Sequence, residues 1–377
     1  MDNNLEQNID SKEKFIISSS PHLYKKETTR NIMWLVVLAL LPAAIFGVFS
    51  FGFNAFIVIF SSVVSCVLAE MLFLKMRNKK ITIDDGSAVL TGLLLGLNMP
   101  PNVPLYVTVI SSFFAIGLVK HAFGGLGENW ANPAIAARVF ALVAWGKKMT
   151  TWAMPVFSDS TSGASADAVS AATPLGAVKS ALSNLVITEN AAQNGLGFFQ
   201  NIFYGLGPMQ LYKDHVNPDA TYFSLFIGDK AGSIGEISIL LLLVGAIYLL
   251  YRKIITLDIP LSYILTSAVI AFVFGGLQYN KGFFQGDFLF HILTGGLVLG
   301  AFFMATDMVT TPLTTKGRIV FGVGCGVLTM LIRLLGGMPE GVSLSILFMN
   351  MMTPTIDRFI TVKPMGYIKE KKQINKG

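Results

Sequence analysis

Long apolar runs, each close to the thickness of a lipid bilayer, constrain the fold of this chain more than any other feature. A transmembrane helix needs about 20 consecutive apolar residues. Seven runs approach this length, namely 31–50, 53–74, 103–119, 232–250, 259–277, 288–305 and 317–335. Three shorter runs, with breaks inside or beside them, lie at 86–99, 133–146 and 341–357. The runs lack the alternation of apolar and polar residues that strands of a membrane barrel show. We therefore predict an all-α polytopic membrane protein with about ten transmembrane helices.

The composition supports the same class. Hydrophobic residues make up 53% of the chain and charged residues only 13%, whereas soluble domains carry about 25% charged residues. The net charge of +6 comes from lysines and arginines that cluster at the ends of apolar runs, where they set topology, so we expect no nucleic-acid partner. The two cysteines, Cys66 and Cys325, are too few to ligate an iron–sulfur cluster or a structural zinc, and we predict no metal site. The sequence does not decide whether Cys66 and Cys325 form a disulfide.

Positive charge also predicts the orientation. With ten spans, most of the 28 lysines and arginines fall on the side of the N-terminus, which the positive-inside rule assigns to the cytoplasm. We predict a cytoplasmic N-terminal segment, 1–30, and a basic cytoplasmic tail, 358–377. The long segment 147–231 then lies outside the cytoplasm, on the outer face of a bacterial inner membrane.

A short internal repeat divides the apolar runs into two halves. The stretch LTGLLLG at 90–96 resembles LTGGLVLG at 293–300, and each precedes a break that contains proline. An odd number of spans in each half inverts the second half relative to the first. We therefore predict two inverted five-helix repeats, 31–146 and 232–357, with broken or half helices, as in many transporters. This pattern alone leaves open a channel or secondary transporter without a redox role.

The polar segment 147–231 separates the two halves. It is too long for an idle connection, because loops beyond about 12–15 residues without structure are uncommon and usually functional. Within it, the stretch DAVSAATPLG surrounds Thr173 with small residues, and Pro174 restricts the backbone just after it. We expect the Thr173 hydroxyl to be sterically open, so that a transferase could modify it.

The stretch DAVSAATPLGAVKS resembles the flavinylation segment of the RnfD/NqrB membrane family. Its members are RnfD of the Rnf electron-transport complex and NqrB of the sodium-pumping NADH:quinone reductase. The matching residues are Asp167, Ser170, Ala171, Ala172 and Thr173, although NqrB has glycine in place of Ala171. The stretches DGSAVLTGLLLGLNMPPNVPLY, KHAFGGLGENWANPAIAARVF, AFFMATDMVTTPLTTKGRIVFG and LIRLLGGMPEGVSLSILFMNMMTPTIDR resemble further blocks. The resemblance thus covers nearly the whole chain.

The resemblance implies two flavins. FMN would be held by a phosphoester on the Thr173 hydroxyl, and a noncovalent riboflavin-type flavin would occupy a pocket that the sequence does not assign. A bound flavin does the redox chemistry while the protein supplies position and electrostatics, so we predict no catalytic residue in this chain.

The resemblance also implies partners. It predicts one component of an ion-translocating ferredoxin:NAD oxidoreductase that works with the A, B, C, E and G subunits of the Rnf complex, with a flavin transferase for maturation, and with Na⁺ or H⁺ as the coupling ion. The short segment before the first apolar run favours the Rnf type, because the quinone-reductase relative has a longer N-terminal extension. The quinone-reductase component is the alternative.

Polar residues at or near the helix breaks are further candidates. In GGLGENWANPA, Asn132 is expected to cap a helix that Pro133 opens, with its positive end towards an anion or cofactor. Asn132 and Arg138 are therefore candidate flavin contacts. Charges inside spans usually face a cavity or partner, but Arg333 lies near a span end and could extend to the interface. The acidic candidates for an ion path or a flavin contact are Asp84, Asp85, Asp307, Glu340 and Asp357.

Two candidates within the apolar runs are expected to be structural. Glu70, near the end of the second run, is interpreted as a helix-end group. His291 lies alone inside a span, so it is expected to hydrogen-bond a neighbour. It has no second histidine at matching depth, as a membrane haem would need.

Overall fold

The computed structural model describes residues 28–79, 83–155, 170–191, 207–215, 217–279, 282–338 and 340–361. The first half contains α1 (Thr29–Phe51), α2 (Phe53–Met76), α3 (Ser87–Leu97), α4 (Leu105–Phe113), the π-helix η2 (Phe114–His121) and α5 (Pro133–Ala144), with a 3₁₀ turn η1 (Ile83–Asp85) before α3. The second half contains α11 (Ile239–Tyr251), α12 (Asp258–Phe274), the 3₁₀-helix η3 (Gly275–Tyr279), α13 (Phe288–Leu293), α14 (Leu297–Leu299), the π-helix η4 (Gly300–Met304), α15 (Thr315–Leu334) and α16 (Val342–Phe359).

The predicted helical class is confirmed. Each of the ten apolar runs coincides with helical structure, and the segments described between the halves hold further helices and a two-stranded ladder. Among the described residues, the helices long and apolar enough to cross a membrane unaided are Thr29–Phe51, Phe53–Met76, Asp258–Tyr279 and Thr315–Leu334. Four further apolar helices are shorter. Helices satisfy their own backbone polar groups, which a lipid environment requires.

One predicted continuous span is broken. The run 288–305 forms α13, α14 and η4 instead of a single helix. Thr294 is extended after α13, and Gly295 adopts a φ of +70° that side chains disfavour, so the helix cannot continue through this point. The run 232–250 also begins its helix late, at Ile239.

The irregular segments of the two halves bond to each other. The backbone N–H of Ile234 donates to the carbonyl of Met99 at 3.2 Å, and that of Gly235 donates to Leu97 at 2.7 Å. The chain just before α11 is thus held against the end of α3. Because lipid offers no hydrogen-bond partners, irregular backbone of a membrane protein needs partners within the protein, and these two bonds supply some of them.

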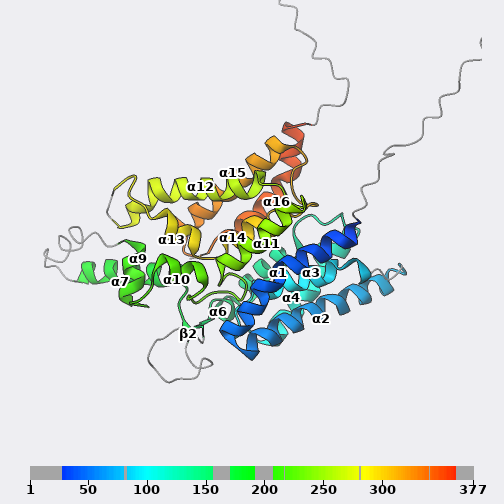
Figure 1. The fold of residues 1–377 in the computed structure, drawn as a ribbon, viewed down its shortest axis with the longest axis horizontal. Helices are drawn as coiled ribbons and strands as arrows, with labels where there is room; N and C mark the ends of the chain where they lie inside the picture. The colour runs from blue at the N-terminus through cyan, green and yellow to red at the C-terminus, as the bar shows by residue number, and fades with distance from the viewer. Residues whose placement is uncertain are drawn as a thin grey trace, which may run out of the picture.

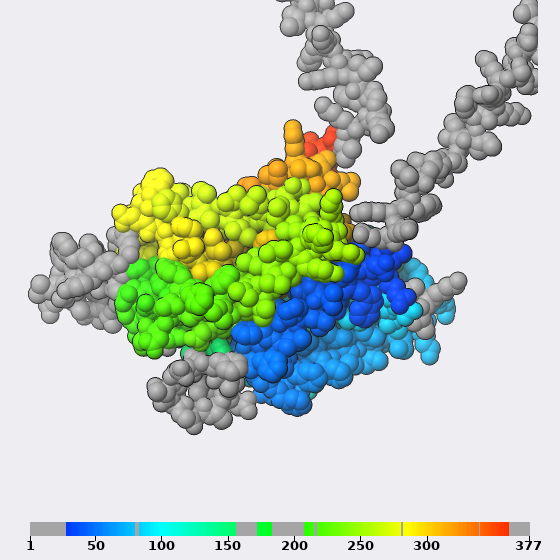
Figure 2. All heavy atoms as spheres, viewed as in Figure 1, coloured from blue at the N-terminus to red at the C-terminus, as the bar shows by residue number. Residues whose placement is uncertain are grey.

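Equivalent helices of the two halves pack together. The first helices, α1 and α11, lie side by side, and so do the fifth helices, α5 and α16. In Figure 1 the α1–α11 contact crosses the middle of the molecule, and Figure 2 shows the two segments touching over the surface. Within the halves, α2 packs on α3 and α12 packs on α15. Pairing of like with like is the arrangement expected of two related repeats.

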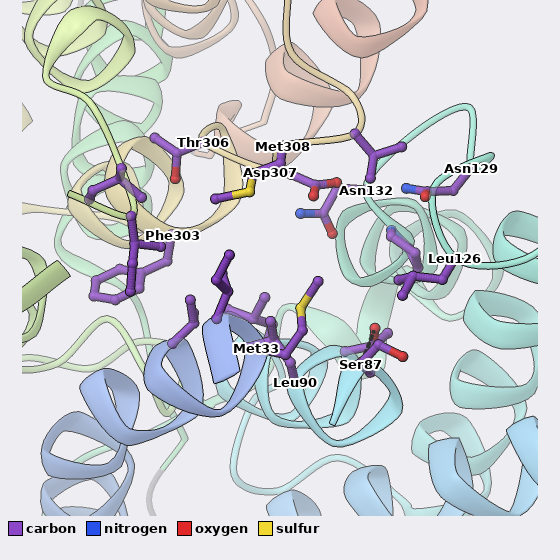
Figure 3. Close-up of a pocket in the computed structure, with 18 of the residues that line it drawn as sticks. Met33, Ser87, Leu90, Leu126, Asn129, Asn132, Phe303, Thr306, Asp307 and Met308 are labelled. Carbon is purple, nitrogen blue, oxygen red and sulfur yellow. Dashed lines mark hydrogen bonds between the residues drawn. The ribbon is translucent and has the colours of Figure 1, made fainter. Parts of the chain in front are cut away.

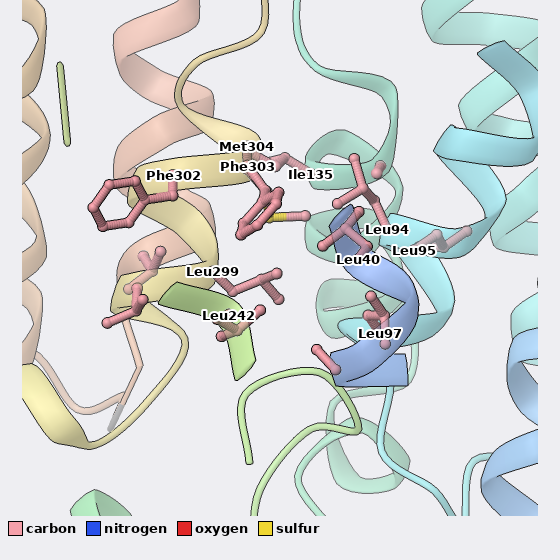
Figure 4. Close-up of a cluster of buried hydrophobic side chains, with 14 of the residues drawn as sticks. Leu40, Leu94, Leu95, Leu97, Ile135, Leu242, Leu299, Phe302, Phe303 and Met304 are labelled. Atoms are coloured by element: carbon pink, nitrogen blue, oxygen red, sulfur yellow. The ribbon is translucent and has the colours of Figure 1, made fainter. Parts of the chain in front are cut away.

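The broken elements of both halves meet in the apolar core. Figure 4 shows side chains of α3 and α1 facing those of α14 and η4 across the centre. The labelled residues, all buried, are Leu40, Leu94, Leu95, Leu97, Ile135, Leu242, Leu299, Phe302, Phe303 and Met304. The break regions are therefore fixed by packing from both halves.

The segment between the halves forms a small unit that packs against them. It contains α6 (Gly146–Met149), β1 (Trp152–Ala153), β2 (Ser170–Ala171), α7 (Pro174–Ala191), α9 (Pro208–His215) and α10 (Tyr222–Ile227). A second apolar cluster joins α7, α9 and α10 to Phe290 of α13. In Figure 1 this unit lies at the opposite end of the molecule from the start of α1 and the end of α16.

Close packing of α3 on α2 gives a stability prediction. A Cβ atom added at Gly92 would lie 2.6 Å from the Val63 Cα and 2.9 Å from the Ser62 carbonyl oxygen, both backbone atoms of α2. We expect Gly92→Ala to lower the free energy of unfolding by about 1–3 kcal/mol through overpacking. Equilibrium unfolding of the purified chain in detergent measures this. Gly146→Ala, where a Cβ meets no atom within 4 Å, is the control. Equal stability of the two variants would contradict the α2–α3 packing.

Candidate functional site

Thr173 occupies the residue before α7 and caps that helix. Its hydroxyl accepts a hydrogen bond from the backbone N–H of Gly176 at 3.1 Å, and its carbonyl accepts one from Ala177 at 2.8 Å. The side chain is buried, with 2% of its surface exposed. The expected open hydroxyl is therefore wrong for this structure. Pro174 starts the helix, so Thr173 takes the capping position and turns its oxygen towards the helix backbone.

The residues before Thr173 are held by a short ladder. Ser170 and Ala171 pair antiparallel with Ala153 and Trp152, respectively. Ala172 is exposed, and Asp167 lies outside the described residues. Two strand residues on one side and an 18-residue helix on the other thus fix the backbone around Thr173.

Asn132 caps α5, as the sequence predicts. Its side-chain oxygen accepts hydrogen bonds from Ala134 at 3.0 Å and Ile135 at 3.4 Å, and Pro133 is the first helical residue. The same side chain donates to the carbonyl of Met304 at the end of η4, at 3.2 Å. Asn132 therefore caps α5 and connects it by a hydrogen bond to η4 of the second half.

Arg138 forms a buried ion pair across the two halves. Its Nη2 lies 2.8 Å from Oε2 of Glu340, which precedes α16, and its Nε donates to the carbonyl of Asn98 at 3.2 Å. The guanidinium thus holds together the breaks that follow α3 and precede α16. Arg138 does not line the cavity that Asn132 reaches, so the structure does not bring these two candidates together at one ligand.

Arg333 and His291 meet at the break after α13. Arg333 is 2% exposed and donates through Nη1 to the carbonyl of His291 at 2.5 Å and through Nη2 to that of Thr294 at 3.1 Å. The expectation that Arg333 reaches the membrane interface is wrong, because α13 covers it. The expected hydrogen bond of His291 is also wrong, since neither ring nitrogen has a partner among the described residues.

A buried polar cluster lies where α2 meets the π-helix η2. Lys120 Nζ lies 2.8 Å from each carboxylate oxygen of Glu70 and 2.7 Å from the Ser87 hydroxyl. His121 Nε2 lies 3.2 Å from Glu70 Oε1. The interpretation of Glu70 as a helix-end group is wrong, because Glu70 is the buried centre of this cluster. A single sequence could not reveal it, since Glu70 and Ser87 lie far along the chain from each other and from the adjacent Lys-His pair.

Lys120 also lines a cavity beside this cluster. The cavity is partly open and has a volume of about 110 Å³. Figure 3 shows Met33 and Leu90 on one side and Phe303, Thr306, Asp307 and Met308 on the other, with Asn132, Asn129, Leu126 and Ser87 around the remaining wall. Apolar walls with a few converging polar groups are typical of a small-molecule site. The cavity lies between the first half and η4 of the second half.

The remaining acidic candidates do not gather. Asp307 lines the cavity and accepts from Thr310 at 3.2 Å, whereas Asp357 lies at the backbone N–H of Leu313. Asp84 and Asp85 belong to η1. No group of three or more potential metal ligands occurs within the described ranges. Cys66 and Cys325 are both free and buried, so the disulfide left open by the sequence does not form in this structure.

These features define a class of protein. It is a helical membrane protein in two halves, and the broken helices of the two halves meet at buried charged side chains. The segment between the halves contains α7, which Thr173 caps. The chain belongs to the NQR2, RnfD, RnfE family, whose model matches residues 16–366.

The relatives agree over almost the whole chain. The chain is 47% identical to the D subunit of the proton-translocating ferredoxin:NAD(+) oxidoreductase complex of Clostridium ljungdahlii, over 92% of this chain and 94% of the relative. It is 40% identical to the D subunit of the Na(+)-translocating ferredoxin:NAD(+) oxidoreductase complex of Acetobacterium woodii, over 95% and 97%. It is 36% identical to the D subunit of the ion-translocating oxidoreductase complex of Stutzerimonas stutzeri, over 91% and 93%.

Proposed function

We propose that this chain is the RnfD-type flavoprotein of an ion-translocating ferredoxin:NAD oxidoreductase and carries electrons through FMN on Thr173. The observation that carries the proposal is the SAAT stretch, Ser170 to Thr173, placed between two membrane halves that align end to end with the D subunits of such complexes. The A, B, C, E and G subunits would complete the complex, and a flavin transferase would attach the FMN. Because two relatives are named for different ions, the coupling ion is Na⁺ or H⁺.

The position of Thr173 suits a phosphoester. A threonine oxygen that carries phosphate can still accept the hydrogen bond of Gly176. The phosphate would lie at the start of α7, where the helix dipole favours an anion. Attachment requires this buried hydroxyl to be reached, so the start of α7 must move away from its neighbours while the transferase acts.

The charge distribution supports the proposed orientation. With both termini in the cytoplasm, the segment 147–231 and its flavin lie outside the bacterial inner membrane. A covalent link there prevents loss of the cofactor from the cell. The unit that contains α7 lies at the far end of the molecule from the start of α1, as this orientation requires.

The cavity beside Lys120 is the proposed site of the noncovalent flavin. Its apolar walls suit a flat ring, and the amides of Asn129 and Asn132 suit the ring's polar edge. Bound there, a flavin supplies electron-transfer chemistry, while the chain orients it and sets the charge around it.

Intact mass and in-gel fluorescence test the proposed function. The chain is produced together with a flavin transferase and the other subunits, purified, and run on a denaturing gel under ultraviolet light. We expect a fluorescent band and a mass increased by one FMN. A chain with its bare polypeptide mass from such a host would refute the proposal and favour a non-redox transporter, which the inverted halves and buried charges otherwise suit. Quinone reduction by the purified complex would favour the quinone-reductase alternative.

Filling the cavity should remove only the noncovalent flavin. Leu90 borders the cavity, and Leu90→Trp would occupy the space of the ring. We expect the flavin released by denaturation to fall at least tenfold, while the covalent fluorescence stays unchanged. Leu118→Trp, at an exposed apolar position of η2, is the matched control. Unchanged flavin release from Leu90→Trp would show that the second flavin binds elsewhere.

A further inference from the structure

A second, open pocket lies beside the cavity shown in Figure 3. Its volume of about 400 Å³ exceeds that of the cavity. The side chain of Trp34 in α1 donates to the carbonyl of Asp84, next to this pocket, at 3.4 Å. The pocket therefore opens near the start of α1, on the predicted cytoplasmic side. Its lining residues are Glu70, Leu74, Lys79, Asp85, His121, Gly124, Gly125 and Leu126.

Leu126 is the residue that the linings of the open pocket and the cavity have in common. Its side chain is 42% exposed, so it contacts solvent as well as both spaces. Figure 3 shows it at the edge of the cavity, between Asn129 and Ser87 in this view. The Leu126 side chain is thus part of the wall between the cavity and the open pocket.

The Glu70–Lys120 ion pair forms another part of this wall. Glu70 lines the open pocket, and Lys120 lines the cavity. Parting this pair would separate two buried charges, which is strongly destabilising. Turning the Leu126 side chain breaks only apolar contacts, and exposed side chains change rotamer within nanoseconds. Leu126 is therefore the part of the wall that opens at the lower free-energy cost.

The loop that carries Leu126 is held at its base and has space at its tip. At the base, Arg77 Nη1 donates to the carbonyl of His121 at 2.6 Å. At the tip, a Cβ atom added at Gly127 would meet no atom within 4 Å. Both neighbours of Leu126 are glycines, and Gly125 and Gly127 adopt φ values of +124° and +93° that other residues rarely reach. The base fixes the position of the loop, while the tip has space to move.

We propose that Leu126 is a gate between the open pocket and the cavity, through which a small molecule reaches the cavity from the predicted cytoplasmic side. That molecule is the noncovalent flavin, so this inference rests on the proposed function and adds to it the route of entry and release. In the position seen here, Leu126 separates the two spaces. When its side chain turns away, the cavity and the open pocket become continuous.

Flavin release from the purified complex tests the gate. Leu126→Ala removes the side chain that separates the two spaces. Because opening of a lid often limits release, we expect the noncovalent flavin to leave about tenfold faster, measured with an excess of a riboflavin-binding protein as the trap. Entry should speed up by a similar factor, so Kd should change much less than the release rate. Phe123→Ala, on the same loop, 57% exposed and outside both linings, is the matched control and should release flavin at the original rate.

Labelling of a cavity cysteine measures access without any flavin. Leu94 lines the cavity and is 4% exposed, so Leu94→Cys places a thiol there. The natural cysteines, Cys66 and Cys325, are both buried and should react slowly. In the full chain without flavin, we expect a water-soluble thiol reagent to label Leu94→Cys about tenfold faster when Leu126→Ala is added. Adding Phe123→Ala should leave the labelling rate unchanged.

The outcomes separate this inference from the proposed function. Equal labelling of Leu94→Cys with and without Leu126→Ala refutes the gate, whatever the rate of flavin release. Faster labelling together with faster flavin release supports it. Faster labelling without faster flavin release shows that the wall opens at Leu126 and refutes the flavin as the molecule that passes there. The mass of FMN on Thr173 is measured independently, so none of these results decides the proposed covalent link.

Discussion

Replacing Thr173 with alanine should remove all covalent flavin from this chain and abolish ferredoxin:NAD oxidoreductase activity of the assembled complex. The reason is chemical: alanine has no oxygen to carry a phosphoester, and a missing carrier interrupts an electron path completely. In-gel fluorescence and intact mass measure the attachment, and NAD reduction by reduced ferredoxin measures the activity. Loss of the cap itself should cost only about 1 kcal/mol of stability, so the variant chain should still fold and assemble.

Thr221→Ala separates the loss of the hydroxyl from the loss of a helix cap. Thr221 caps α10 through the same type of bond, accepting from the backbone N–H of Ser224 at 3.1 Å. The control should keep its flavin and most of its activity. Thr173→Ser should keep a hydroxyl at the same position and retain some attachment. Full fluorescence in Thr173→Ala would place the covalent link on another residue.

Lys120→Met should destabilise the chain more than any other substitution considered. Removing the ammonium group leaves the Glu70 carboxylate, 2% exposed, with only His121 as a possible counter-charge among the described residues. Breaking a buried ion pair by removing one partner costs about 3–5 kcal/mol. Equilibrium unfolding of the purified chain in detergent measures the loss of free energy.

The double variant Lys120→Met/Glu70→Gln tests the cause of that loss. Replacing the unpaired Glu70 carboxylate with an uncharged amide should recover much of the lost stability, because the unpaired buried charge accounts for most of the loss. The half-exposed pair Arg318–Asp258 gives the matched control, with 26% of each side chain exposed. Arg318→Met should cost less than about 1 kcal/mol. A Lys120→Met effect as small as that of Arg318→Met would mean that the Glu70 pair is solvated.

Local features of this fold were predictable from the sequence, and long-range pairings were not. Apolar length predicted the helices, and the Asn-Pro pair at Asn132 predicted the start of α5, because both depend on neighbouring residues alone. The Arg138–Glu340 pair joins residues 202 positions apart, and Glu70–Lys120 joins residues 50 apart. Such contacts depend on how the helices pack against each other, which the spacing of apolar residues along the sequence does not predict.

In the candidate site, too, local features were predictable from the sequence and long-range packing was not. The SAAT stretch made Thr173 a candidate through its neighbours alone, but the expected exposure of Thr173 was wrong because it caps the helix that the following proline opens. The break at Gly295 was hidden inside a run that is apolar enough to form a helix. Its conformation follows from the packing of Arg333 and Leu175 around it, which the sequence could not predict.

The bonds from Ile234 to Met99 and from Gly235 to Leu97 have a mechanical consequence. They join the chain before α11 to the end of α3, so a rocking motion of one half against the other would have to break them. Rotating one half against the other would leave these amides without hydrogen-bond partners and would also separate Arg138 from Glu340. We therefore expect conformational changes of this chain to be small local displacements, with its two halves moving as a single rigid body.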